Sequence, residues 1–180
     1  MKKIISIIVF GVLICFLGGC KNSATSSVEE YLNNYKNLDE KVLIDMNTII
    51  EKENISEDNK NLYIDIYKKQ YSDLKYKIEN EEYNGDEAVI KVRINVYDLY
   101  KVQKEASNYL ATHADEFNDE NGNYDLNKFI EYKLNNMKNT ADRVDYTIDF
   151  YVVKSSNGWT VSSLSNSDLE KIHGIYNYES

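Results

Sequence analysis

The chain has 180 residues, of which 30 are acidic and 21 basic, so its formal net charge is −9 at pH 7. This balance argues against a nucleic-acid-binding protein, whose affinity depends on cationic side chains, and against electrostatic attachment to anionic lipid. The length fits one domain with its own hydrophobic core.

The N-terminus has the features of a secretory signal. Lys2 and Lys3 precede an apolar run over residues 4–17, and small residues follow at 18–19. A charged start, an apolar segment of about 7–15 residues and a small-residue cleavage site are typical of a signal peptide. The run is shorter than the roughly 20 residues of a membrane-spanning helix. The alternative is an uncleaved anchor helix.

Leu17-Gly18-Gly19-Cys20 resembles the lipobox of bacterial lipoproteins. The resemblance implies that residues 1–19 are removed and that a diacylglyceryl group carrying fatty acids such as palmitate is attached to the sulfur of Cys20. The protein would then sit on the outer face of the cytoplasmic membrane, with the membrane as its first partner. The abundance of Lys, Asn, Ile and Tyr favours a low-GC Gram-positive bacterium as the source.

Removal of the signal has two consequences for the mature chain. Lys2 and Lys3 are the only charged residues that it contains, so the net charge becomes −11. Cys15 is lost and Cys20 carries lipid, so no disulfide or thiol chemistry is expected. Residues 20–26 would be the lipidated cysteine and a polar tether, which reaches at most about 20 Å. Residues 27–180 are expected to form a single α+β domain.

The first part of this domain shows helical periodicity. Ser27-Val28-Glu29-Glu30 forms a capping-box pattern, and apolar residues recur at three- and four-residue steps from Val28 to Ile49, with a break near 37–40 as an alternative. Ser56 begins a second predicted helix that extends to about Tyr71.

Strand-like alternation follows over 74–79 and 90–96, and Asn84-Gly85 between them is a hairpin signal. Asp98 is the expected N-cap of a third helix, with its apolar face running to Leu110. A polar loop at 119–123 leads to a fourth helix over about 126–137.

Alternation returns over 144–152, and the turn at 156–158 leads into a second strand over 159–164. Ser167-Asp168-Leu169-Glu170 is a further capping-box pattern that predicts a short terminal helix. Two hairpins with matching apolar faces predict a four-stranded antiparallel, curved sheet with helices packed on one face.

This order of elements resembles the NTF2-like and cystatin-like folds, to which many small secreted lipoproteins of Gram-positive bacteria belong. The residues that carry the resemblance are Val28-Glu29-Glu30-Tyr31-Leu32, Tyr35-Lys36-Asn37-Leu38-Asp39 and the closing hairpin over 144–164. The helical stretch at 99–137 is longer than in the simplest members, which leaves the strand order open.

One loop has the composition of a metal site. Asp119, Asn121, Asn123 and Asp125 are weak candidates for a loose calcium site. The EF-hand pattern fails because it would place Phe117 and Lys128 at ligand positions. A polar turn with Asp125 capping the next helix is the preferred interpretation. We expect no cofactor.

Catalytic patterns are weak throughout the chain. His113 and His173 are far apart in the sequence, and no Gly-x-Ser-x-Gly motif is present. The NTF2-like resemblance includes enzymes of the ketosteroid isomerase type, which use an Asp base with a Tyr or protonated Asp donor. No motif aligns the available candidates with those enzymes, and we predict no catalytic activity. These candidates are Tyr35, Asp39, Tyr76, Tyr146 and Asp149.

The sequence therefore predicts a non-catalytic lipoprotein that binds another envelope component, either a protein or a glycan. An outward tyrosine patch including Tyr97 and Tyr151 is a candidate surface, because tyrosine is enriched at interfaces. One alternative is a small-ligand pocket between the helix at 28–49 and the sheet, with or without catalysis. Another is an immunity-type lipoprotein that neutralises a basic toxin.

Overall fold

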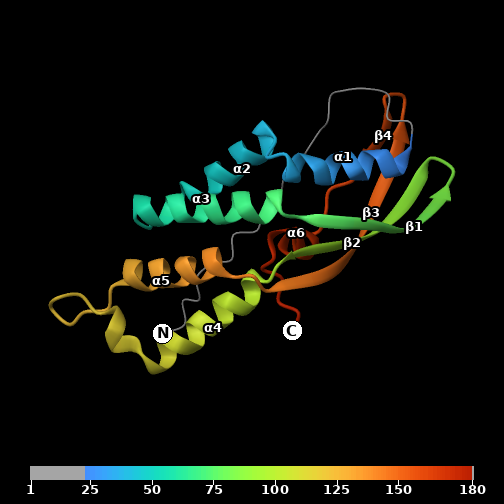
Figure 1. Ribbon diagram of the computed structural model, residues 1–180. Helices are drawn as coiled ribbons and strands as arrows, with labels where there is room; N and C mark the ends of the chain where they lie inside the picture. Colours follow the sequence, from blue (N-terminus) through green and yellow to red (C-terminus); the bar gives the residue numbers. More distant parts are fainter. Residues whose placement is uncertain (1–22, 180) are drawn as a thin grey trace.

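The computed structural model describes residues 23–179, and the predicted signal peptide and Cys20 lie outside this range. Within it the chain is α+β, with four antiparallel strands in a curved, open sheet and helices packed against it (Figure 1). The fold class predicted from the two hairpins is confirmed.

The strands are β1 (Lys75–Asn84), β2 (Glu87–Tyr97), β3 (Arg143–Ser155) and β4 (Gly158–Val161). Their order in the sheet is β1-β2-β3-β4, with every neighbouring pair antiparallel. The strand order that the sequence left open is thus consecutive. β4 is shorter than expected and ends at Val161 rather than Leu164.

The two faces of the sheet differ because side chains alternate along each strand. Ile90, Val92 and Phe150 are completely buried on the inner face, under the helices. Lys91 and Asp149 pair across β2 and β3 on the opposite face, and both are exposed. The sheet therefore has one packed face and one wet face, as the sequence predicted.

Helix α1 (Ala24–Lys36) lies across the inner face (Figure 1). Its N-cap is Ser23 rather than the predicted Ser27. Ser27 is completely buried, and its hydroxyl donates to the backbone carbonyl of Trp159 at 2.9 Å. The capping-box prediction at 27–30 was wrong because this hydroxyl is used in a long-range contact with β4. Residues 23–26 of the predicted tether over 20–26 therefore belong to the cap and first turn of α1, and residues 20–22 lie outside the described range.

The break near 37–40 is present. Leu38 has a φ of 53°, which ends α1, and Asp39 caps α2 (Glu40–Ile50). Ser56, Asp98 and Asp125 cap the next three α-helices as predicted. These helices are α3 (Glu57–Ser72), α4 (Leu99–Thr112) and α5 (Leu126–Asn139), and a 3₁₀ turn, η1 (Ala114–Phe117), follows α4.

The terminal helix α6 (Asn166–His173) begins earlier than predicted. Its cap is Ser165, whose side chain accepts the N–H of Asp168 at 3.2 Å, so the capping box starts at Ser165 and not at Ser167. Helices α2, α3, α5 and α4 form a layer that extends beyond one end of the strands (Figure 1).

A cluster of aromatic rings joins α1, α3 and α6. Tyr35, Tyr71 and His173 are at most 1 % exposed, and the Tyr71 hydroxyl lies 3.1 Å from Nδ1 of His173. Burial lowers the pKa of His173 to about 3, because the low-dielectric interior disfavours the imidazolium. The folded protein thus holds this histidine neutral above about pH 3.

His173→Asn is expected to flatten the acid side of the stability profile. Below pH 6.5 the unfolded chain gains a proton that the folded chain excludes until about pH 3. The fold therefore loses about 1.4 kcal/mol per pH unit as the pH falls through this window. Urea unfolding between pH 7.5 and 4.5 measures the slope. His113→Asn is the control, since His113 is exposed. Equal slopes in wild type and His173→Asn would contradict the assignment.

Gly174 ends α6 with a φ of 72°, in the left-handed region. A Cβ at this position would overlap the backbone oxygen of Tyr97 and the amide nitrogen of Gln70. Its own carbonyl accepts the N–H of Tyr100 at 2.8 Å. Glycine is therefore required both for the backbone conformation and for the close approach of α6 to the end of β2.

Gly174→Ala is expected to lower the free energy of unfolding by about 3 kcal/mol, since steric overlap adds to left-handed backbone strain. Gly122→Ala is the matched control: its φ is 80°, but the space around its Cβ is empty. It should lose only about 1 kcal/mol. Chemical denaturation measures the free energy of unfolding of both variants. Similar decreases in the two would show that the steric overlap at Gly174 does not destabilise the fold.

Candidate functional site

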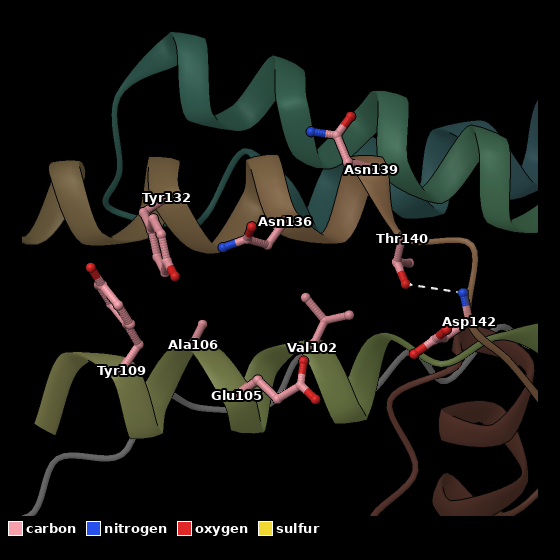
Figure 2. A pocket seen from close by; sticks show the side chains of 9 residues that line it. All are labelled: Val102, Glu105, Ala106, Tyr109, Tyr132, Asn136, Asn139, Thr140 and Asp142. Carbon is pink, nitrogen blue, oxygen red and sulfur yellow. Dashed lines mark hydrogen bonds between the residues drawn. The ribbon is translucent and has the colours of Figure 1, made fainter. Parts of the chain in front are cut away.

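The helices α4 and α5 enclose a hollow of about 420 Å³ (Figure 2), which we call the α4/α5 groove. This volume is in the range of small-ligand sites. Val102 and Ala106 of α4 point into it and are buried, while the side chains around its mouth are polar and partly or fully exposed. The groove exists because these two small side chains do not fill the space between the helices.

Polar acceptors line the groove. The carboxylates of Glu105 and Asp142 and the side chains of Asn136, Asn139 and Thr140 belong to its wall, and no lysine, arginine or histidine does. Thr140 accepts the backbone N–H of Asp142 at 3.2 Å, which fixes the end of the groove near the sheet. The wall of the groove therefore carries a negative charge.

Asp142 has one cationic neighbour outside the wall. Its Oδ2 lies 2.5 Å from Nζ of Lys101, and their side chains are 57 % and 45 % exposed. An ion pair this exposed contributes about 0–1 kcal/mol, and one carboxylate can accept several hydrogen bonds at once. Asp142 thus remains able to accept from a ligand.

Aromatic rings close the other end of the groove. The ring of Tyr109 stacks on that of Tyr132 at 5.1 Å and on that of His113 at 4.0 Å. Phe117 and Phe129 pack edge to face beneath them, at 5.4 Å. The hydrogen bond from Tyr109 to the Glu116 carboxylate raises the pKa of this tyrosine. This small core holds the free ends of α4 and α5 together.

The weak metal candidates have other roles in the described chain. Asp119 accepts the backbone N–H groups of Asn121 and Asn123, both at 2.8 Å, and these bonds lower its pKa. Asp125 caps α5 by accepting from Asn127 and Lys128. Among residues 23–179, no group of three His, Cys, Asp or Glu side chains is placed to hold a metal ion.

Asp125 also borders a smaller hollow of about 210 Å³ between the starts of α3 and α5. The amide oxygen of Asn127 accepts the Ser56 N–H there at 2.9 Å, and the Asn59 side chain donates to the Asn127 backbone carbonyl at 3.1 Å. These bonds join the two helices, so we interpret this hollow as a structural joint.

The structure separates the candidate catalytic residues. Tyr35 and Tyr146 are buried in the core, whereas Asp39 and Asp149 are exposed on α2 and on the wet sheet face. The Tyr76 hydroxyl donates to Asn33 at 3.1 Å. In this arrangement no candidate base faces a candidate donor across a cavity of the described chain.

The outward tyrosines do not form one patch. The ring of Tyr97 lies between Nζ of Lys69 and the guanidinium of Arg143, each 4.5 Å from its centre, and its hydroxyl donates to Asp73. Tyr151 is 62 % exposed and pairs with Val89, eight residues along β2 from Tyr97. At about 3.3 Å per residue, the two lie roughly 26 Å apart.

Side chains fill the space between α1 and the sheet, where a ligand pocket was one expectation. Val28, Leu32, Ile90 and Phe150 have no exposed surface, so no water-sized gap adjoins them. Of the two hollows described above, the larger lies instead between α4 and α5. Sequence analysis missed this groove because its lining residues come from two helices, and Val102 and Asp142 are 40 positions apart.

Comparisons with protein-family models, with curated proteins and with solved structures found no match for the chain. The likeness to NTF2-like and cystatin-like folds therefore stays a prediction beyond the α+β class. Within residues 23–179, no helix combines the length and the apolar character needed to cross a bilayer.

Proposed function

We propose that this protein is a lipid-anchored, non-catalytic binding module of the bacterial cell envelope, held on the outer face of the cytoplasmic membrane through diacylglyceryl-Cys20. The observation that carries the proposal is the sequence Leu17-Gly18-Gly19-Cys20 directly after an apolar run that follows two lysines. Its partner would be an envelope protein or glycan, and the low-GC Gram-positive source belongs to the same proposal.

The start of α1 supports close attachment to the membrane. Ser23 caps this helix, which leaves Lys21 and Asn22 between the cap and Cys20. Three residues of extended chain span about 11 Å at most. A lipid on Cys20 would thus hold the N-terminal end of α1 next to the headgroups.

The position of the α4/α5 groove supports binding at the end of the domain opposite to the N-terminus of α1. The N-terminus of α1 lies beside β4 and the hairpin turns, whereas α4 and α5 extend away from that end (Figure 1). The α4/α5 groove would therefore face away from the bilayer, toward soluble or wall-bound partners.

Two other functions are kept as alternatives to the envelope-binding proposal. A small-ligand protein is favoured by the 420 Å³ groove, although its site lies outside the α1–sheet interface where the NTF2-like resemblance would place it. The immunity-type role depends on the acidic net charge alone. The scattered positions of the candidate bases and donors lead us to propose binding rather than catalysis.

Cys20→Ala is expected to abolish incorporation of radiolabelled palmitate and to block lipoprotein-type processing, because the thioether cannot form. Cys15→Ala is the matched control and should be labelled like wild type, since this residue lies within the predicted signal. Metabolic labelling followed by immunoprecipitation measures both. Undiminished labelling of Cys20→Ala would refute the lipobox.

The predicted orientation can be measured with single cysteine labels in the lipidated protein on vesicles. A fluorophore at Asn157→Cys, in the turn before β4, should be quenched by headgroup-linked nitroxides. A fluorophore at Glu120→Cys, in the loop before α5, should be quenched several-fold less. Equal quenching at the two positions would contradict the orientation.

A further inference from the structure

We propose that the α4/α5 groove binds an organic cation, a primary ammonium on an aliphatic chain, as presented by a polyamine or by a lysine side chain of a peptide. The inference rests on the binding function proposed above: a peptide lysine would belong to an envelope-protein partner, and a free polyamine to the small-ligand alternative. Its basis is the combination of a ligand-sized hollow, an acceptor-rich wall and an apolar floor in one place.

The wall of the groove selects for a donor with positive charge. Glu105 and Asp142 carry carboxylates, which accept hydrogen bonds and cannot donate when ionised. Glu105 forms no ion pair or hydrogen bond with the described residues, although the ammonium of Lys101, which pairs with Asp142, is also attracted to it. An anion would be repelled, and a neutral apolar ligand would desolvate both carboxylates without compensation.

An ammonium group satisfies these acceptors. It carries three donors and no acceptor, and hydrogen bonds between ions are roughly twice as strong as neutral ones. Asn136 and Asn139 offer amide oxygens beside the carboxylates. The side chain of Asp142 lies at the end nearest Thr140, and that of Glu105 lies along the α4 side (Figure 2).

The floor and the far end of the groove suit the stem of such a ligand. Val102 and Ala106 present small apolar side chains between the helices, and methylene stems of cationic groups pack well on apolar surface. Tyr132 is half-buried at the aromatic end, and its hydroxyl has no hydrogen bond with any described residue. This hydroxyl can bond a second polar group of the ligand.

Calorimetric titration of the full chain in neutral detergent micelles tests the proposal, with spermidine and with an acetylated, amidated Gly-Lys-Gly peptide as probes. We expect saturable binding of at least one probe at low salt, weakened by 0.5 M NaCl through screening. Binding of only one would identify the ligand as a free polyamine or as a peptide. Triacetylspermidine, which lacks the charges, should not bind.

Variants locate the site. Glu105→Gln and Asp142→Asn should each weaken binding roughly tenfold, the loss expected for one charge-assisted contact. Glu120→Gln changes the net charge equally but lies in the exposed loop before α5, and it should bind like wild type. Thermal unfolding confirms that each variant is folded.

Three results would overturn the inference: no binding of either probe at millimolar concentration, equal binding of triacetylspermidine, or unchanged affinity in both groove variants. None of them bears on lipid attachment, which the palmitate labelling of Cys20 tests separately. Conversely, a wild-type protein that binds spermidine but incorporates no palmitate would leave the groove assigned and would refute the membrane setting.

Discussion

Three parts of this protein meet at the buried side-chain amide of Gln70, and the position of the helical layer depends on it. The amide oxygen accepts the N–H of Tyr97 at 3.0 Å, and the amide nitrogen lies 3.4 Å from the carbonyls of Tyr97 and Ile172. One side chain of α3 thereby holds the end of β2 and the end of α6. Leaving its buried groups unpaired would cost more than the bonds themselves contribute, so the joint is rigid. Gly174 allows it to close, since a side chain there would occupy the space of the amide.

The same joint sets the direction of α4, which begins two residues after Tyr97. Asp98 caps α4 and accepts from the Tyr178 hydroxyl at 2.9 Å, so the C-terminal segment holds the start of this helix. α5 packs between α3 and α4, and its far end is held by the separate cluster around Phe117 and Phe129. The two helices are therefore held at both ends, and the buried Val102 and Ala106 line the groove between them. The groove follows from this arrangement.

Local patterns in the sequence predicted most of the fold, because caps, turns and periodicity depend on near neighbours. Ser56, Asp98 and Asp125 each precede a helical period without a competing cap, and their helices begin where expected. Ser27 misled the prediction because its hydroxyl bonds Trp159, 132 residues away, and such a contact leaves no local trace. The groove was missed for the same reason: its walls come from two helices, and its emptiness depends on how those helices cross. The proposed lipid site is the reverse case: its motif is local in the sequence, and it stays a prediction because Cys20 lies outside the described residues.

If Cys20 carries the proposed lipid, the lipid and the acidic net charge would have opposite effects on membrane attachment, and their magnitudes can be compared. Ten buried methylenes contribute about 8 kcal/mol at roughly 0.8 kcal/mol each. A carboxylate near an anionic surface is repelled by an energy comparable to the attraction of one lysine, about 1 kcal/mol, and the effect fades within a Debye length of about 8–10 Å. Since the chain from Cys20 to Ser23 can span at most about 11 Å, only the charges at the α1 end of an anchored domain would lie that close. Two acyl chains on Cys20 would therefore outweigh the repulsion, and in the proposed orientation the acidic groove would lie beyond the range of the membrane charge.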